Sequence, residues 1–95
     1  MKMVWLRSAV KDLERLHEFV LEHNAKSARN LALKIKAAVD HLIDHPELGK
    51  PVKDLSNFRD LAILFGAGGY VLRYRLHAET IFIVSIRHYR ENDFH

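Results

Sequence analysis

The chain has 95 residues, which is enough for one domain with a single hydrophobic core and leaves no length for a second. Hydrophobic residues make up 48% of the composition and charged residues 28%, proportions typical of a folded globular protein. The absence of cysteine excludes disulfides, thiol nucleophiles and cysteine-ligated zinc. No apolar run reaches the roughly 20 residues that span a bilayer, and the first residues lack the core of a signal peptide. We therefore expect a cytoplasmic protein with no membrane partner.

The net charge of +3 is concentrated near the end of the chain. Between Tyr70 and Arg90 there are four arginines against a single acid, Glu79, whereas the rest of the chain carries equal numbers of basic and acidic residues. A local excess of positive charge favours an anionic partner. Charge alone does not distinguish nucleic acid from an acidic protein.

The first half of the chain predicts a strand followed by two amphipathic helices. Residues 2–7 hold a short apolar run ahead of Ser8, a residue type that caps helices, and so predict a strand. Apolar residues then recur at helical spacing over residues 9–22. After an interruption at Asn24, a second apolar stripe covers residues 28–45. Two long helices with so short a break predict an antiparallel hairpin packed against one sheet.

The second half predicts a loop and three consecutive strands. Residues 45–57, HPELGKPVKDLSN, contain both prolines of the chain and predict a loop. Strand-like runs follow at residues 59–65, 70–76 and 80–87, with short turns between them. We expect an α+β fold of order β-α-α-β-β-β, in which an antiparallel sheet carries the two-helix hairpin on one face.

Alternation along the middle strand predicts one core face and one cationic face. The residues expected on the core face are Tyr70, Leu72, Tyr74 and Leu76. Arg73 and Arg75 share the other face, and Arg87 lies near the end of the next strand. A guanidinium cluster of this kind suits phosphate or carboxylate recognition, so these three arginines are candidate residues for binding a nucleic acid or another target. The alternative is an ordinary solvated face of an antiparallel sheet.

His88, Tyr89 and Arg90 follow the final strand and are candidate catalytic residues. Cleavage of RNA needs a proton carrier, a second acid or stacking platform, and a group that stabilises phosphate charge, and these three side chains suit those roles. The alternative is a polar strand end at which His88 and Tyr89 bond to the backbone.

His41 and His45 are four residues apart near the end of the second predicted helix, a spacing at which two metal ligands share one face. The glutamate of a zinc-protease helix is missing between them. Charged histidines in a last helical turn also interact favourably with the negative end of the helix dipole. We expect no metal and no cofactor.

Four features in sequence order resemble the RelE/ParE toxin superfamily of bacterial toxin–antitoxin systems. They are the early helix pair, HPELGKPV, GGYVLRYRL and the ending IFIVSIRHYRE. The resemblance covers nearly the whole chain, so residues 1–95 are interpreted as one toxin domain. It implies a cognate antitoxin that wraps and blocks the toxin in a hetero-oligomer. We expect the antitoxin to cover the apolar seam beside the two helices and to reach toward the arginine face.

Two activities occur in this superfamily: RelE-like members cut mRNA in the ribosomal A site, and ParE-like members inhibit DNA gyrase by binding. The long helix pair and the HPELG loop are more similar to the ParE branch. Arg73 lies two positions after the superfamily's central-strand arginine, whose place Val71 occupies, although His88, Tyr89 and Arg90 lie near the C-terminal group of RelE-like members. We expect a gyrase inhibitor that is not itself an enzyme. The alternatives are a ribosome-dependent mRNA endonuclease and an inactive relative that binds an antitoxin or DNA.

Overall fold

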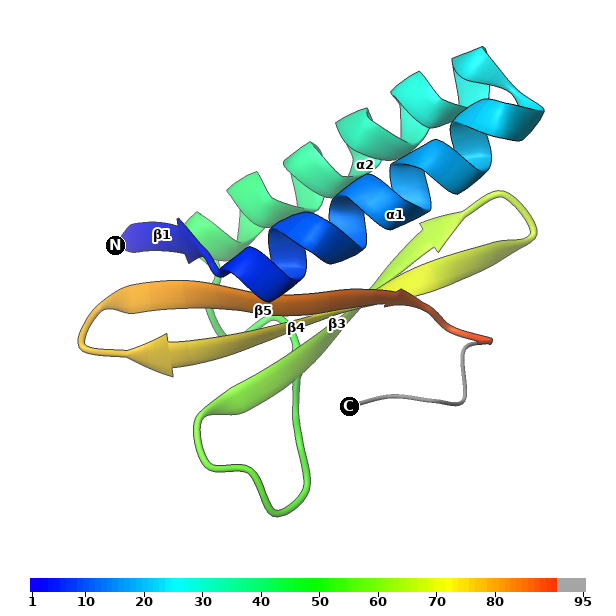
Figure 1. Cartoon of the computed structure of the whole chain (residues 1–95). Coiled ribbons are helices and arrows are strands. Elements are labelled where there is room, and N and C mark those ends of the chain that lie inside the picture. Colours follow the sequence, from blue (N-terminus) through cyan, green and yellow to red (C-terminus); the bar gives the residue numbers. More distant parts are fainter. Residues whose placement is uncertain (91–95) are drawn as a thin grey trace.

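The computed structural model describes residues 1–90 of the chain. Its elements, in chain order, are β1 (Lys2–Trp5), α1 (Arg7–His23), α2 (Ala25–Asp44), β2 (Lys50–Pro51), β3 (Phe58–Phe65), β4 (Gly68–His77) and β5 (Thr80–His88). Figure 1 shows two layers, in which the helices lie side by side over one face of a twisted sheet. The predicted α+β class and helical hairpin are confirmed, and β2 is a short additional strand within the predicted loop.

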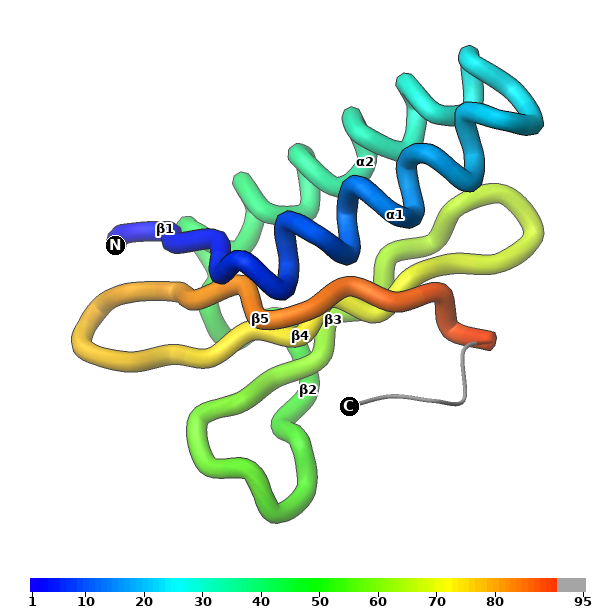
Figure 2. Tube along the Cα trace, in the orientation of Figure 1, coloured from blue at the N-terminus to red at the C-terminus, as the bar shows by residue number. Residues whose placement is uncertain are grey.

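The sheet is mixed, with the strand order β1-β5-β4-β3-β2. Strands β3, β4 and β5 form the predicted antiparallel meander, and β2 pairs antiparallel with β3. Strand β1 instead runs parallel to β5, and Figure 2 shows this N-terminal strand beside β5. The direction of an edge strand depends on where the rest of the chain travels, so the residues of β1 alone could not predict it.

Asn24 separates the two helices and allows the tight hairpin. Its side-chain oxygen accepts a hydrogen bond from the backbone N–H of Ser27 at 3.0 Å, which caps the first turn of α2. Its own N–H donates to the carbonyl of Val20 at 2.9 Å and ends α1. One residue therefore satisfies backbone groups of both helices.

The core lies between the helices and the sheet. Its largest fully buried side chains are Tyr74, Leu31, Leu42, Leu72, Ile81, Ile83 and Ile86. Burial of each large aliphatic side chain contributes about 1.5–3 kcal/mol to folding, so this layer carries most of the stability. On β4, Tyr70, Leu72 and Tyr74 are buried while Arg75 and His77 are exposed, which confirms the predicted alternation. Within residues 1–90, none of the helices is both long and apolar enough to cross a membrane.

A β-bulge in β5 decides which side chains of this strand face the core. Arg73 pairs with Ser85 but the next residue, Tyr74, pairs with Ile83, so Val84 is an extra residue. A shift of one residue moves every later side chain to the opposite face. Beyond the bulge, Ile86 is therefore on the core face. Simple alternation would place each of the next two residues, Arg87 and His88, on the opposite face from the one it occupies.

Helix α1 satisfies the backbone groups that the bulge leaves irregular. The hydroxyl of Ser8 donates to the carbonyl of Val84 at 2.6 Å, and the N–H of Ile86 donates to Asp12 Oδ2 at 3.0 Å. The predicted capping role of Ser8 is wrong, because α1 begins at Arg7 and has no side-chain cap. Ser8 lies within the first turn, where its hydroxyl reaches the sheet instead.

Candidate functional site

Arg73 is engaged within the sheet. It lies opposite Asp60 of β3, and its guanidinium donates two hydrogen bonds to that carboxylate, from Nε to Oδ1 at 2.8 Å and from Nη2 to Oδ2 at 3.1 Å. The two side chains are only 16% and 26% exposed, so water screens this ion pair less than a surface pair. Asp60 therefore compensates part of the positive charge that the sequence places on this strand.

The other two candidate arginines share the open face of the sheet, which is the face away from the helices. Arg75 is exposed and lies over the ring of Phe58 at 5.8 Å, a cation–π geometry. Arg87 is half-buried and lies opposite Val71. The open face is thus cationic, while the predicted role of Arg73, Arg75 and Arg87 in target binding stays a prediction.

His88 lies on the opposite side of the sheet from these arginines. It pairs with Tyr70 of β4, and the two rings meet edge to face with centroids 5.4 Å apart. Tyr70 belongs to the core and is only 6% exposed, so this contact directs the His88 ring toward the helical side. His88 Nδ1 also accepts the N–H of Arg90 at 3.1 Å, as in the alternative of a polar strand end.

Tyr89 and Arg90 are exposed beside His88 at the end of the sheet. The backbone N–H of Tyr89 donates to the carbonyl of Gly69, and its hydroxyl accepts a hydrogen bond from Arg90 Nε at 3.2 Å. The rings of His88 and Tyr89 lie 5.0 Å apart. The structure therefore groups the three candidate catalytic residues with one another, but it separates His88 from the open-face arginines.

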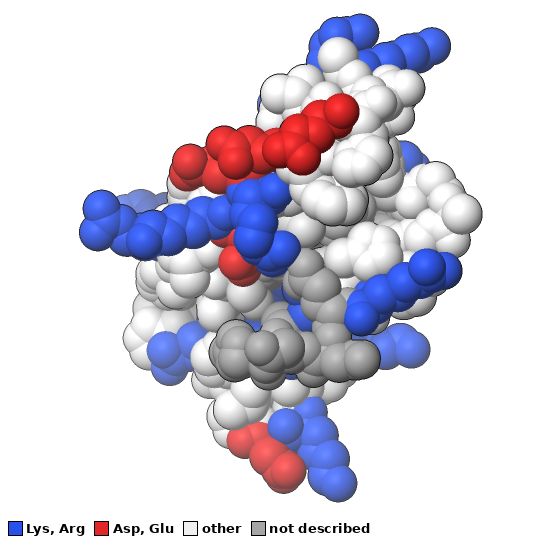
Figure 3. Space-filling view, turned by 45° about the vertical axis from the view of Figure 1, so that its right-hand side comes forward, with Lys and Arg blue, Asp and Glu red and all other residues white. Residues whose placement is uncertain are grey.

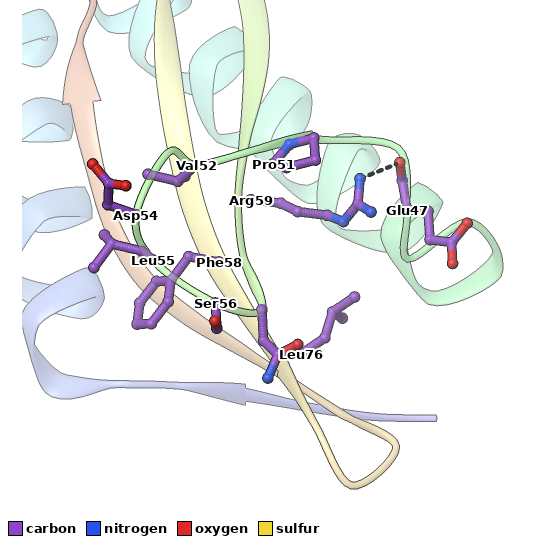
Figure 4. Close-up of a pocket in the computed structure, with 10 residues that line it drawn as sticks. Glu47, Pro51, Val52, Asp54, Leu55, Ser56, Phe58, Arg59 and Leu76 are labelled. Carbon is purple, nitrogen blue, oxygen red and sulfur yellow. Dashed lines mark hydrogen bonds between the residues drawn. The ribbon is translucent and has the colours of Figure 1, made fainter.

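Two further side chains, which the sequence did not single out as site residues, hold the loop between α2 and β2. The hydroxyl of Tyr74 donates to the carbonyl of Pro46 at 2.7 Å and accepts the N–H of Gly49 at 2.8 Å. Arg59 Nη1 donates to the carbonyls of Glu47 at 3.1 Å and Gly49 at 2.6 Å. Figure 4 shows Arg59 extending from its strand toward the backbone of Glu47. We call these four hydrogen bonds the loop clamp.

The loop clamp depends on both burial and a glycine. Burial raises the pKa of Tyr74 above its ordinary value of 10.0, which extends to higher pH the range over which the hydroxyl is protonated and able to donate. A Cβ at Gly49 would lie 2.7 Å from the Tyr74 ring and 3.0 Å from the carbonyl oxygen of Asp60, so only glycine fits. One signal was available in the sequence, because a tyrosine on a core face needs a partner for its hydroxyl.

A pocket of about 650 Å³ opens between this loop and the open face. Its lining residues are Leu48, Lys50, Pro51, Asp60, Leu61, Ala62, Val71 and Arg87. Most of them are aliphatic, with Lys50 and Arg87 as cations, and Asp60 is the acid bound to Arg73. We call this pocket the loop groove.

Charges of opposite sign are distributed unevenly over the two layers. Figure 3 shows acidic side chains in one row along the helical layer, with basic side chains directly beside this row and elsewhere on the same view. Glu14, Glu18 and Glu22 are exposed on α1 at intervals of four residues, which places acids on one side of that helix.

Within residues 1–90, no group of three or more His, Asp or Glu side chains is arranged to hold a metal ion, although the rings of His41 and His45 lie 5.7 Å apart.

Known proteins resemble this chain in fold and in sequence. A solved structure described as "Chromosomal ParDE TA system from P. aeruginosa" superposes with a TM-score of 0.73 over 93% of this chain and 95% of that chain, at 19% identity. At that identity the likeness concerns the fold. Among curated proteins, "Toxin RelE3" of Caulobacter vibrioides is 34% identical over 80 residues, which are 84% of this chain and 85% of the relative. "Toxin RelE2" of the same species is 30% identical over 87 residues, 92% of this chain and 93% of the relative.

The family profile matches almost the full length. Residues 3–93 match the family described as "ParE toxin of type II toxin-antitoxin system, parDE". The predicted resemblance to the RelE/ParE superfamily is confirmed by this match and by the curated relatives. The chain therefore belongs to the ParE toxin family and is the toxin component of a type II toxin–antitoxin system, with a cognate antitoxin as its partner.

Proposed function

We propose that this toxin acts by binding DNA gyrase and inhibiting it, and that it does not cut RNA. The observation that carries the proposal is the separation of His88 from the open-face arginines. His88 packs edge to face on Tyr70 on the helical side of the sheet, whereas Arg73 and Arg87 belong to the open face. The proton carrier is thus held apart from the candidate phosphate-binding arginines of the open face, although Arg90 lies beside it.

RNA cleavage makes a geometric demand that His88 does not meet together with Arg73 and Arg87 of the open face. The group that moves a proton must lie within hydrogen-bond distance, about 3 Å, of an oxygen on the reacting sugar or phosphate, and cationic donors must reach the same phosphate. Arg73 donates two hydrogen bonds to Asp60 and is only 16% exposed. Recruiting it to a phosphate would break a partly buried ion pair, which is costly. Binding a protein target requires no such rearrangement.

The names of the relatives leave the target open, because the family profile is that of ParE toxins and the curated relatives are named RelE toxins. The proposal therefore depends on the geometry of this chain.

The helical layer offers a surface for the antitoxin. Val10, Leu21 and Ile43 are large hydrophobic residues left 39%, 47% and 40% exposed on the helical layer, which supports the predicted seam beside α1 and α2 as the antitoxin surface.

A test in growing cells uses His88→Ala and Tyr89→Phe. Neither side chain has a role in gyrase binding under this proposal, so both variants should inhibit growth as strongly as the wild type, with DNA damage and filamentous cells. The matched comparison is the rate of translation soon after induction, which should stay near normal at first. If His88→Ala abolishes toxicity while the variant stays folded and binds antitoxin, the ribonuclease alternative replaces the proposal.

A further inference from the structure

We propose that the loop groove seats an extended, acidic segment of the toxin's protein target, with an aliphatic side chain of that segment packed between Leu48 and Val71. This inference rests on the proposed function, because it names the surface that binds the target and the chemistry of what binds there. Leu48 comes from the loop and Val71 from β4, and both line the same pocket of about 650 Å³.

The first argument is that Leu48 is displayed on a rigid support. Its side chain is 50% exposed, yet the residues on either side of it are held by the loop clamp. Tyr74 and Arg59, which form the clamp, are themselves part of the core face. An exposed apolar side chain on a backbone that is already held in place costs less conformational entropy on binding than one on a mobile loop. The fully buried centre of a protein interface is more apolar than its rim, which suits an apolar side chain at this position.

The second argument is the charge of the groove. Lys50 and Arg87 are cations at its border, and the acid in its lining, Asp60, is bound to Arg73. Arg75 adds a further exposed cation on the same face. Positive potential around an apolar floor is complementary to a segment in which carboxylates flank an aliphatic side chain.

The third argument distinguishes a protein segment from a nucleic acid. Single-stranded nucleic acids bind by stacking their bases on aromatic rings along a cationic track. Within the described part of the chain, none of the residues that line the groove is aromatic. Val71 stands where the superfamily resemblance places an arginine, so the floor of the groove is apolar at that point. The geometry favours a peptide over an RNA strand.

The experiment measures the affinity of the purified full-length toxin for purified gyrase. Leu48→Asp puts a carboxylate into the groove, and Lys50→Glu reverses a charge at its border. The matched control is Leu33→Asp, because Leu33 is 64% exposed on α2 and lines a different pocket. We expect Leu48→Asp to weaken binding by about tenfold or more and Lys50→Glu by several-fold, while the control stays within about twofold. Circular dichroism establishes that each variant is folded.

The possible outcomes separate this inference from the proposed function. A wild-type toxin that neither binds nor inhibits gyrase contradicts the proposed function. If the wild type and the variants Leu48→Asp and Lys50→Glu all bind gyrase equally well, only the groove proposal is contradicted. The groove proposal is also overturned if these variants lose antitoxin binding but keep gyrase binding, or if the toxin forms a dimer that Leu48→Asp dissociates, since the occupant would then be the antitoxin or a second copy.

Discussion

Tyr74 connects the hydrophobic core to the surface loop. Its side chain is fully buried, yet its hydroxyl bonds to Pro46 and Gly49 of a loop that borders the open face. The two backbone groups that it satisfies would lose a partner if the hydroxyl were removed, and unpaired backbone groups are costly when buried. A single side chain thus couples the packing of the sheet to the position of the loop.

Replacement of Tyr74 by phenylalanine keeps the ring and removes both hydrogen bonds. We expect Tyr74→Phe to lower the free energy of unfolding by about 1–3 kcal/mol, measured by urea denaturation. The matched control is Tyr89→Phe, whose hydroxyl is on an exposed side chain, and it should change stability by no more than about 0.5 kcal/mol. Equal stabilities of the two variants would contradict the clamp.

The same residue predicts a dependence of stability on pH. Burial raises the pKa of Tyr74 above 10.0, so above that pH the unfolded chain loses the proton before the folded protein does. The unfolded state then binds fewer protons, and the free energy of unfolding falls as the pH rises from about 10 toward the folded pKa. From about pH 8 to about pH 11, the urea midpoint of unfolding should decrease more in the wild type than in Tyr74→Phe. Equal decreases of the urea midpoint in the two proteins would contradict the assignment of this pH dependence to Tyr74.

At the scale of elements, the contact between α1 and the bulge of β5 fixes the faces of the last strand. Continued alternation from Ile81 and Ile83 would place Arg87 on the core side. The extra residue at Val84 moves Arg87 to the open face and His88 to the helical side. Asp12 stabilises this shift, because it accepts the N–H of Ile86, which lies just beyond the extra residue.

Asp12→Ala removes that acceptor and should lower the free energy of unfolding by about 1–3 kcal/mol. Native-state hydrogen exchange gives the sharper readout, because the amide of Ile86 should exchange much faster than its neighbours. Glu14→Ala is the control, since Glu14 is an exposed acid on the same helix, and it should leave the Ile86 amide protected. Unchanged protection in Asp12→Ala would mean that β4 and β5 hold the bulge without the helix.

Local patterns in the sequence predict the elements better than they predict the contacts. Helical spacing places both helices, and alternation on β4 identifies its core and open faces. The bulge at Val84 has no signal of its own, so the sequence could not predict that His88 and Arg87 lie on opposite faces from those that simple alternation gives them. The pairing of Arg73 with Asp60 depends on the register of β3 and β4, which the turn between them sets. Long-range register therefore decides which of the candidate residues share a face, and local patterns do not supply it.

At the scale of the whole molecule, the two layers present separate surfaces. The helical layer carries the exposed apolar residues of the predicted antitoxin seam, and the sheet presents the loop groove with its cations. Figure 1 shows the helices on one side of the sheet only, so a partner bound to the helices leaves the open face uncovered unless it also extends around an edge. If the loop groove binds the target as proposed, inhibition by the antitoxin requires either such an extension or a change in the sheet.

The central claim is that the toxin binds gyrase and does not cut RNA. Its most direct test measures the supercoiling activity of purified gyrase and the cleavage of ribosome-bound mRNA with the same toxin preparation, each with and without the antitoxin. The account predicts loss of supercoiling or trapped cleaved DNA, intact mRNA, and reversal by the antitoxin. Cut mRNA with unaffected gyrase would contradict it and would make His88, Tyr89 and Arg90 the catalytic candidates.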